Sequence, residues 1–144
     1  LQTYREFNLH KHDEMAKPYP GVVDVVRKLH DDGAKLGLVT SKLSTGARRG
    51  LRLLDLEAEL PVRVCADDVE NGKPHPEPVL RALELLGSQP SDALFLGDSD
   101  HDLLAGNAAG VTTVAVGWGP FARETLEAAE PRAWVESADE ILGF

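Results

Sequence analysis

The chain has 144 residues, of which 42% are hydrophobic, and a formal net charge of −9. This length fits one domain with a substantial core, and the acidic balance argues against a nucleic-acid surface, which needs clustered Lys and Arg. The single cysteine, Cys65, excludes a disulfide framework and a zinc cluster. No apolar run reaches the roughly 18 residues of a membrane span, and no signal peptide is visible. We therefore expect a cytoplasmic protein without membrane or nucleic-acid partners.

The first half of the chain alternates between helical and strand patterns. Residues 1–15 are polar with scattered apolar side chains, which predicts a helix, and the segment Pro18–Gly21 ends it with two prolines and a glycine. Apolar residues then recur at helical spacing from Val22, and Gly33 ends that helix. The pattern next predicts a strand at 35–40, a helix at 45–54 and a short strand at 62–65.

The second half continues this alternation. Pro76 opens a helix, because proline fits the first helical turn, and Gly87 ends it. The remaining pattern predicts a strand at 93–96, a helix at 101–109, a strand at 112–116, a helix at 124–129, a short strand at 133–135 and a last helical turn at 138–142. Such alternation is typical of βαβ units, so the predicted fold class is α/β, a Rossmann-like core with a parallel sheet and helices on both faces.

Polar residues follow three of the predicted strands. The segment Thr40-Ser41-Lys42 follows the first, Lys73 lies in the long loop 67–76, and Asp98 and Asp102 follow the strand at 93–96. Because right-handed crossovers bring the carboxyl ends of parallel strands to one edge, we expect these groups to lie close together. Hydroxyl, ammonium and carboxylate groups together suit a phosphate and a hard cation such as Mg²⁺.

The carboxylates after the strand at 93–96 have a second interpretation. Asp98 or Ser99 could be the N-cap of the next helix, with Asp102 near the positive end of its dipole. The residues by themselves leave the cap and the metal site equally open.

These three segments also resemble a known family. Thr40-Ser41-Lys42, then Gly72-Lys73-Pro74, then Gly97-Asp98-Ser99 with Asp102, resemble motifs two, three and four of the haloacid dehalogenase (HAD) superfamily. The likeness is closest to its phosphoglycolate-phosphatase and pyrophosphatase-like branch. Residues 18–22 resemble the return from the helical cap of that branch into its core. The resemblance therefore implies a cap remnant at 1–18 and a Rossmann-like core at 19–144.

The resemblance implies a role for each matching residue. Thr40 and the backbone N–H of Ser41 would bind the transferring phosphoryl group, and Lys73 would neutralise its charge. Asp98 would ligate Mg²⁺, and Asp102 would hold the metal site directly or through water. Paired acids at these positions favour a magnesium-dependent phosphatase of small phosphorylated metabolites over a metal-free dehalogenase.

The chain departs from the family pattern at one motif. The family's first motif is an apolar strand that ends in Asp-x-Asp, where the first Asp is the nucleophile and the second is the general acid–base. Here only Asp98-Ser99-Asp100 has this spelling, and it belongs to motif four. We therefore expect a truncated piece that begins in the last cap helix and lacks the nucleophile and the central strand, unless another chain supplies them. Exposed sheet edges would then favour self-association. The alternative is a non-catalytic remnant or phosphate-binding module.

Four further residues each have two interpretations. Lys42 could reach a carboxylate or phosphate of the substrate or be a surface charge. His75 is expected to pack in its turn rather than touch the substrate. Trp118 and Phe121 follow the last main strand, and could line the pocket mouth or pack against the core.

Overall fold

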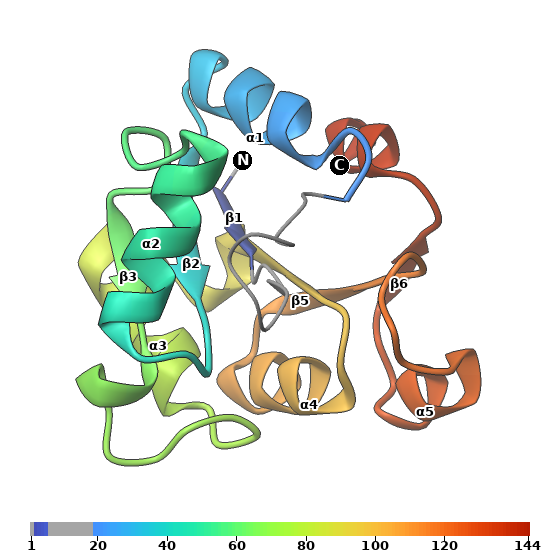
Figure 1. The fold of residues 1–144 in the computed structure, drawn as a ribbon. Coiled ribbons are helices and arrows are strands. Elements are labelled where there is room, and N and C mark those ends of the chain that lie inside the picture. The colour runs from blue at the N-terminus through green and yellow to red at the C-terminus, as the bar shows by residue number, and fades with distance from the viewer. Residues whose placement is uncertain (1, 6–18) are drawn as a thin grey trace.

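The computed structural model describes the backbone of residues 2–5 and all of residues 19–144. These residues form an α/β fold around a six-stranded sheet with the order β3-β2-β1-β4-β5-β6 (Figure 1). Every neighbouring pair of strands is parallel. The strands are β1 Gln2–Arg5, β2 Lys35–Val39, β3 Val62–Val64, β4 Ala93–Gly97, β5 Thr112–Val116 and β6 Ala133–Val135.

Helices connect these strands and cover both faces of the sheet, as the sequence predicts. The α-helices are α1 Val22–Asp31, α2 Ser44–Leu54, α3 Glu77–Leu86, α4 Asp100–Ala109 and α5 Arg123–Ala128. The described part of the chain also contains three short 3₁₀ helices, η2 Ala66–Asp68, η3 Pro90–Asp92 and η4 Ala138–Gly143. The last predicted helical turn is thus 3₁₀ rather than α. No helix among the described residues has the length and apolarity needed to cross a bilayer.

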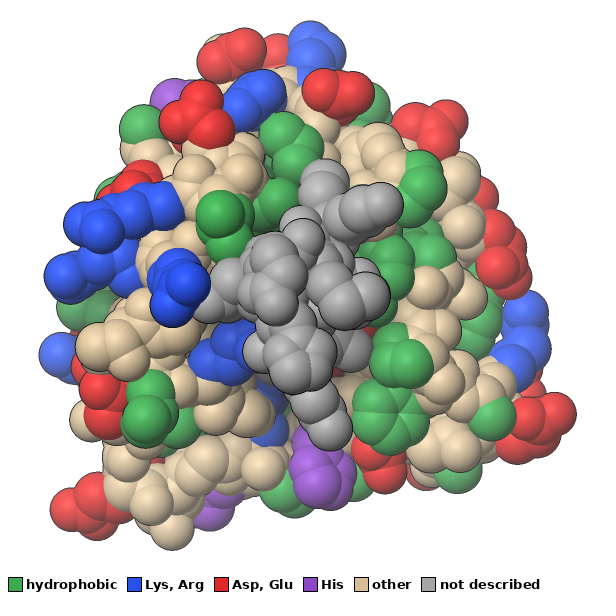
Figure 2. Space-filling model, in the orientation of Figure 1, with side chains coloured by type: hydrophobic (Ala, Val, Ile, Leu, Met, Phe, Trp, Pro, Cys, Tyr) green, Lys and Arg blue, Asp and Glu red, His purple; other side chains and the backbone are tan. Residues whose placement is uncertain are grey.

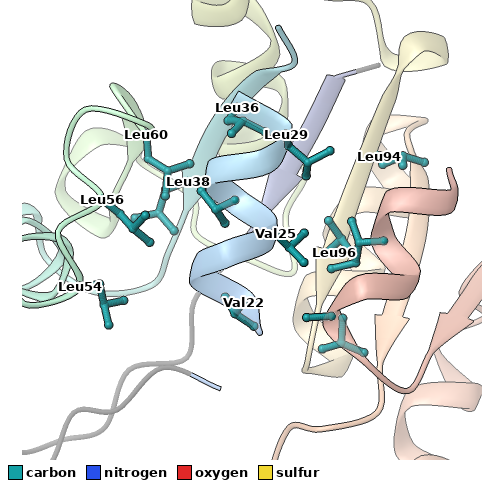
Figure 3. Packing of buried hydrophobic residues seen from close by; sticks show 14 of the residues in the cluster. Val22, Val25, Leu29, Leu36, Leu38, Leu54, Leu56, Leu60, Leu94 and Leu96 are labelled. Atoms are coloured by element: carbon teal, nitrogen blue, oxygen red, sulfur yellow. The ribbon is translucent and has the colours of Figure 1, made fainter. Parts of the chain in front are cut away.

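The core is divided by the sheet into two sides. Leu94 and Leu96 of β4 point to the side of α1, where they join a cluster that includes Val25 and Leu29 (Figure 3). Phe95 of the same strand joins the opposite cluster, built with residues of α3 and α4. This alternation along one strand, apolar on both sides, is the pattern of a parallel sheet that is buried on both faces.

The helix predicted for residues 1–15 is wrong at its start. Residues Gln2–Arg5 form β1, which lies between β2 and β4, and Thr3 pairs with Leu36 on one side and Leu94 on the other. A segment between two strands satisfies its backbone groups in both directions, and this outweighs local helix preference. Residues 6–15, with the rest of the predicted helix, lie outside the described residues.

The prediction that a missing central strand leaves exposed sheet edges is therefore wrong as well. Among the described strands, the central position is filled by β1, and only β3 and β6 stand at the ends of the strand order. The chain proceeds from β1 outward through β2 and β3, and then returns to β4 on the other side. Such a reversal of direction is where open α/β sheets bind ligands, beyond the carboxyl ends of the strands.

Candidate functional site

The turn from β4 into α4 holds the first part of the site. Ser99 is the N-cap of α4, and its Oγ accepts a hydrogen bond from the backbone N–H of Asp102 at 3.2 Å. Oδ2 of Asp102 in turn accepts bonds from the backbone N–H groups of Asp98 at 3.1 Å and Ser99 at 3.2 Å. The cap interpretation is therefore confirmed for Ser99 and Asp102, which form a reciprocal capping box.

Gly97 makes this tight turn possible. A Cβ atom at Gly97 would lie 2.4 Å from the Cβ of Asp102. Any other residue at this strand end would push the Asp102 carboxylate away from the backbone donors that hold it.

Lys73 and Asp102 form a buried ion pair. Nζ of Lys73 lies 2.5 Å from Oδ1 of Asp102, and the two side chains are 3% and 0% exposed. These residues are 29 positions apart in the chain, so the contact joins the loop before α3 to the start of α4. The Asp102 carboxylate thus accepts bonds at both oxygens, one from an ammonium group and two from backbone N–H groups.

Asp98 borders an open hollow at the same sheet edge. Its side chain is buried, and it follows directly on β4. The hollow has a volume of about 340 Å³, and it is lined by Ser41, Lys73, Asp98, Ser99, Asp100, His101 and Phe121. Three predicted site residues from three different loops, Ser41, Lys73 and Asp98, therefore meet around one space.

The segment after β5 packs closely on Asp98. A Cβ atom at Gly119 would lie 2.6 Å from the Cβ of Asp98, so a larger residue at this position would displace the carboxylate. Tyr19 also lies within electrostatic reach of Asp98. Its pKa is raised, first by burial of the phenol and second by the negative charge of Asp98.

The loop after β2 is anchored from within and from the neighbouring strand. Thr40 is buried, its Oγ1 accepts from the backbone N–H of Lys42 at 3.1 Å, and its own N–H donates to the carbonyl of Val64 at 3.0 Å. The carbonyl of Lys42 accepts from the N–H of Ala66 at 2.9 Å. Neither Thr40 nor Lys42 is among the residues that line the hollow, so Ser41 is the member of this loop that borders it.

Asp67 supplies a cap that α2 lacks in its own sequence. The N-cap residue of α2 is Leu43, whose side chain cannot accept a hydrogen bond. Asp67 instead accepts from the backbone N–H of Ser44 at 2.9 Å and from its hydroxyl at 2.6 Å. These bonds hold the pKa of Asp67 below its usual value, because they favour the charged carboxylate.

The remaining candidates have more ordinary positions. His75 is exposed, its Nδ1 accepts from the backbone N–H of Glu77 at 3.1 Å, and it does not line the hollow, so it bonds within its turn rather than bordering the site. Phe121 is 44% exposed and lines the hollow, whereas Trp118 packs against the core cluster on the side of α1.

Figure 2 shows basic side chains on the left of the molecule, the side on which Figure 1 places α2.

Three residues near the site are absent from the sequence-based prediction. Asp67 and Glu77 anchor the loops that carry predicted site residues, and Gly119 lies against Asp98. Asp67 acts on a residue 23 positions away, Glu77 on residues six and seven positions back across a loop, and Gly119 through backbone packing. None of these relations leaves a local pattern in the sequence. The proline before Glu77 predicts a helix start there, but not the direction of its side chain.

The donor set of this edge fits a hard divalent cation. The Asp98 carboxylate is an oxygen ligand beside an open hollow that Asp100 also borders. Mg²⁺ typically takes one or two protein carboxylates and keeps waters and phosphate oxygens as its other ligands. Asp98 is the residue that would hold the ion, and Asp102, already bonded at both oxygens, would support the turn that presents it.

Comparisons with known proteins show which proteins the chain is similar to. Residues 1–116 match the family described as haloacid dehalogenase-like hydrolase. The chain is 42% identical to the pyrophosphatase PpaX of Anoxybacillus flavithermus over 144 residues, which are all of this chain and 67% of that protein.

Solved structures of similar fold come from the same superfamily and from related phosphatases. A HAD-superfamily hydrolase from Geobacter sulfurreducens is 33% identical, with a TM-score of 0.78 over 91% of this chain and 62% of that one. A Lactobacillus plantarum protein named as a candidate phosphoglycolate phosphatase is 29% identical, with a TM-score of 0.83 over 92% of this chain and 62% of that one. This chain thus spans about two thirds of the length of the proteins it resembles.

Proposed function

Because this chain belongs to the haloacid dehalogenase-like hydrolases, we propose that its site binds the phosphoryl group of a small phosphorylated metabolite in a magnesium-dependent phosphatase. The observation that carries this proposal is the meeting of Ser41, Lys73 and Asp98 around one hollow at the carboxyl edge of the sheet. An ammonium group, a hydroxyl and a buried carboxylate in this arrangement suit a phosphate together with a cation.

Each residue has a role that follows from its position. Ser41 borders the hollow and would donate to phosphate oxygens, with Thr40 holding the turn that presents it. Lys73 would balance phosphate charge, and Asp98 would hold Mg²⁺. When bound, the cation supplies charge stabilisation at the transferring phosphoryl group. Asp102 would act as a positioning residue through its bonds to Lys73 and to the turn at Asp98.

The 144-residue chain is proposed to be inactive by itself. Phosphoryl transfer through a covalent intermediate needs a carboxylate close to phosphorus and in line with the leaving group. The strand at the centre of the sheet, β1, has the sequence Gln-Thr-Tyr-Arg and carries no carboxylate. Asp98 is a poor substitute, because a carboxylate that ligates a metal is not available to attack.

This observation also supports a second candidate function. A site with phosphate-binding groups and no carboxylate in its central strand fits a non-catalytic phosphate-binding module. The two functions differ in turnover and share phosphate binding, so one set of measurements separates them.

The test combines turnover with binding. We would assay p-nitrophenyl phosphate, pyrophosphate and small sugar and acid phosphates with and without Mg²⁺, using this chain and a version extended at its N-terminus through an apolar Asp-x-Asp strand. We expect Mg²⁺-dependent turnover from the extended version only. Calorimetry on this chain should show weak Mg²⁺ binding that Asp98→Ala abolishes and Asp92→Ala, a change at an exposed surface residue, leaves intact.

Each other outcome has a definite meaning. Turnover by the short chain would show that the nucleophile is among its own residues and would contradict its proposed inactivity. An inactive extended version that still binds phosphate would favour the binding module. A chain that binds neither phosphate nor Mg²⁺ would refute both functions.

A further inference from the structure

The loop that carries Lys73 has little packing of its own. Residues 70–72 and 74–75 are exposed, although the Lys73 side chain between them is only 3% exposed. One turn within the loop is closed by a hydrogen bond from the N–H of His75 to the carbonyl of Gly72 at 3.0 Å. Something outside the turn must therefore fix the loop relative to the sheet, because exposed loops without anchors open readily.

Glu77, the first residue of α3, reaches back to this loop. Its Oε2 accepts from the backbone N–H of Glu70 at 2.9 Å. Its Oε1 accepts from the backbone N–H of Asn71 at 3.2 Å and from the Asn71 side chain at 3.1 Å. The backbone N–H of Glu77 also donates to Nδ1 of His75 at 3.1 Å. One residue thus holds the loop on both sides of Lys73.

The charge of Glu77 strengthens this attachment. Its pKa is held below the usual value, first by the bond from the Glu70 N–H and then by the Asn71 donors. Bonds from N–H groups to an ionised carboxylate are stronger than bonds between neutral groups. The carboxylate therefore remains an ionised anchor for the loop at neutral pH.

The base of the anchor is a well-packed helix. Val79, Ala82 and Leu83 of α3 are buried in the cluster on the side of α4, and α3 packs against β2 and β3. A residue fixed to this helix has a defined position relative to the sheet edge where Asp98 and Asp102 lie. The bonds to Glu77 therefore fix the position of the loop relative to the same sheet edge.

We propose that Glu77 is the positioning residue for Lys73, holding the loop so that the ammonium group stays at Asp102 and at the hollow. Glu77 does not border the hollow, so it acts through Lys73 and does not touch the phosphate. The relevance of this position to phosphate rests on the proposed function, whereas the position itself does not.

The first test measures the accessibility of the Lys73 amine in the free chain. Brief acetylation with acetic anhydride, followed by mass spectrometry, gives the labelling rate of each lysine. We expect Lys73 to be labelled slowly in the parent chain and roughly tenfold faster in Glu77→Ala, the change that corresponds to losing about one net hydrogen bond to a charged group. Glu77→Gln should give an intermediate rate, because its amide keeps one accepting oxygen and loses the other.

Two controls distinguish release of the Lys73 loop from unfolding of the whole chain. Cys65 is buried, and its pKa is raised to about 11, mainly by burial, so its slow reaction with a disulfide reagent reports that the fold is intact. The matched control is Glu84→Ala in the same helix, since Glu84 is exposed and pairs with Arg81. It should leave the labelling of Lys73 unchanged.

The second test measures binding of inorganic phosphate in the presence of Mg²⁺ by calorimetry. Glu77→Ala should weaken binding less than Lys73→Ala does, because the ammonium group is still present, and the double variant should be no weaker than Lys73→Ala alone. This non-additivity is expected only if Glu77 acts through Lys73.

Two outcomes would overturn the proposal. One is an unchanged labelling rate of Lys73 in Glu77→Ala while Cys65 stays protected. The other is a parallel increase at Lys73 and Cys65, which would make Glu77 a general stability residue. If the parent chain binds no phosphate while Lys73 labelling still depends on Glu77, the proposed function fails and the positioning role stands.

Discussion

The Lys73–Asp102 pair shows how one contact serves both fold and site. Both side chains are almost fully buried, and removing two charges from water is costly unless further bonds satisfy them. Asp102 obtains such bonds from the N–H groups of Asp98 and Ser99. The pair therefore fixes the ammonium group beside the turn that presents Asp98, and the same bonds cap α4.

Breaking this pair should be strongly destabilising. Asp102→Asn leaves the Lys73 ammonium buried beside a neutral amide, so we expect the free energy of unfolding to fall by about 3–5 kcal/mol. Urea unfolding followed by circular dichroism measures this change. The control is Asp100→Asn in the same helical turn, where Asp100 is only partly buried and the change should stay within about 0.5 kcal/mol. A loss in Asp102→Asn no larger than the control would refute the buried pair.

At the scale of elements, close packing decides what each helix tolerates. A Cβ atom at Gly46 of α2 would meet nothing within 4 Å, whereas a Cβ at Gly106 of α4 would lie 2.5 Å from Thr113 and 2.9 Å from Phe95. The two glycines are alike in local sequence preference and differ only in what the sheet places beside them. The contact at Gly106 keeps α4 close to β4 and β5, the strands next to the site.

These two glycines should respond oppositely to alanine. Gly46→Ala should raise the free energy of unfolding by up to about 1 kcal/mol, because alanine is the better helix former. Gly106→Ala should lower it by about 1–3 kcal/mol, because overpacking outweighs the same gain. Urea unfolding of both variants measures the difference. Equal stabilisation by both changes would contradict the close approach of α4 to the sheet.

The cap that Asp67 provides for α2 should depend on pH. The pKa of Asp67 is lowered in the folded chain from an ordinary value of 3.8, so its stabilising contribution is present above that value and is lost as the pH falls below it. We expect Asp67→Ala to lower the melting temperature at neutral pH. The difference in melting temperature between this variant and the parent chain should narrow below about pH 4. Calorimetric melting across this range tests it. The matched control, Asp92→Ala, should show no such narrowing, and a constant gap for Asp67→Ala would contradict the cap.

At the scale of the whole molecule, the sheet depends on its central strand. β1 pairs with β2 and β4 along its whole length, so it joins the half of the sheet that ends in β3 to the half that ends in β6. The hollow lies where the loops of these two halves meet, since Ser41 follows β2 and Asp98 follows β4. The geometry of the site therefore depends on a strand that contributes none of the lining residues among those described.

Interrupting β1 should separate these halves. Thr3 lies in the middle of the strand, and Thr3→Pro removes a backbone N–H donor and disfavours pairing on both sides. We expect an unfolding free energy lower by about 1–3 kcal/mol, together with self-association through the freed edges of β2 and β4. Urea unfolding and sedimentation velocity measure the two effects.

The control for this change keeps the backbone donor. Thr3→Val retains both the N–H group and a β-branched side chain, so it should leave stability and the monomer fraction close to those of the parent chain. A Thr3→Pro variant that matched Thr3→Val in both measurements would show that β1 does not hold the two halves together.

The sequence by itself determined the helices α1 to α5, the strands β2 to β6 and the edge at which the polar loops meet, but not the short 3₁₀ helices η2 and η3. The bounds of the predicted elements lie within two residues of the prediction, because hydrophobic periodicity, Gly33, Gly87 and the proline at the start of α3 act within a few residues of chain. The rule for parallel βαβ units then brings Ser41, Lys73 and Asp98 to one edge. The resemblance of their motifs to a known family added the chemistry.

Only the tertiary structure decided which strands pair with β1 and which side chains contact one another. β1 lacks an apolar pattern and is a strand because β2 and β4 supply backbone partners on both sides. Lys73 meets Asp102 across 29 residues, and Asp67 caps α2 across 23. The Glu77 carboxylate bonds to the backbone of its own loop. Such contacts depend on how α2, α3 and α4 pack on the sheet. No local sequence pattern predicts them, because the residues next to each partner in the chain would be the same whether or not the contact formed.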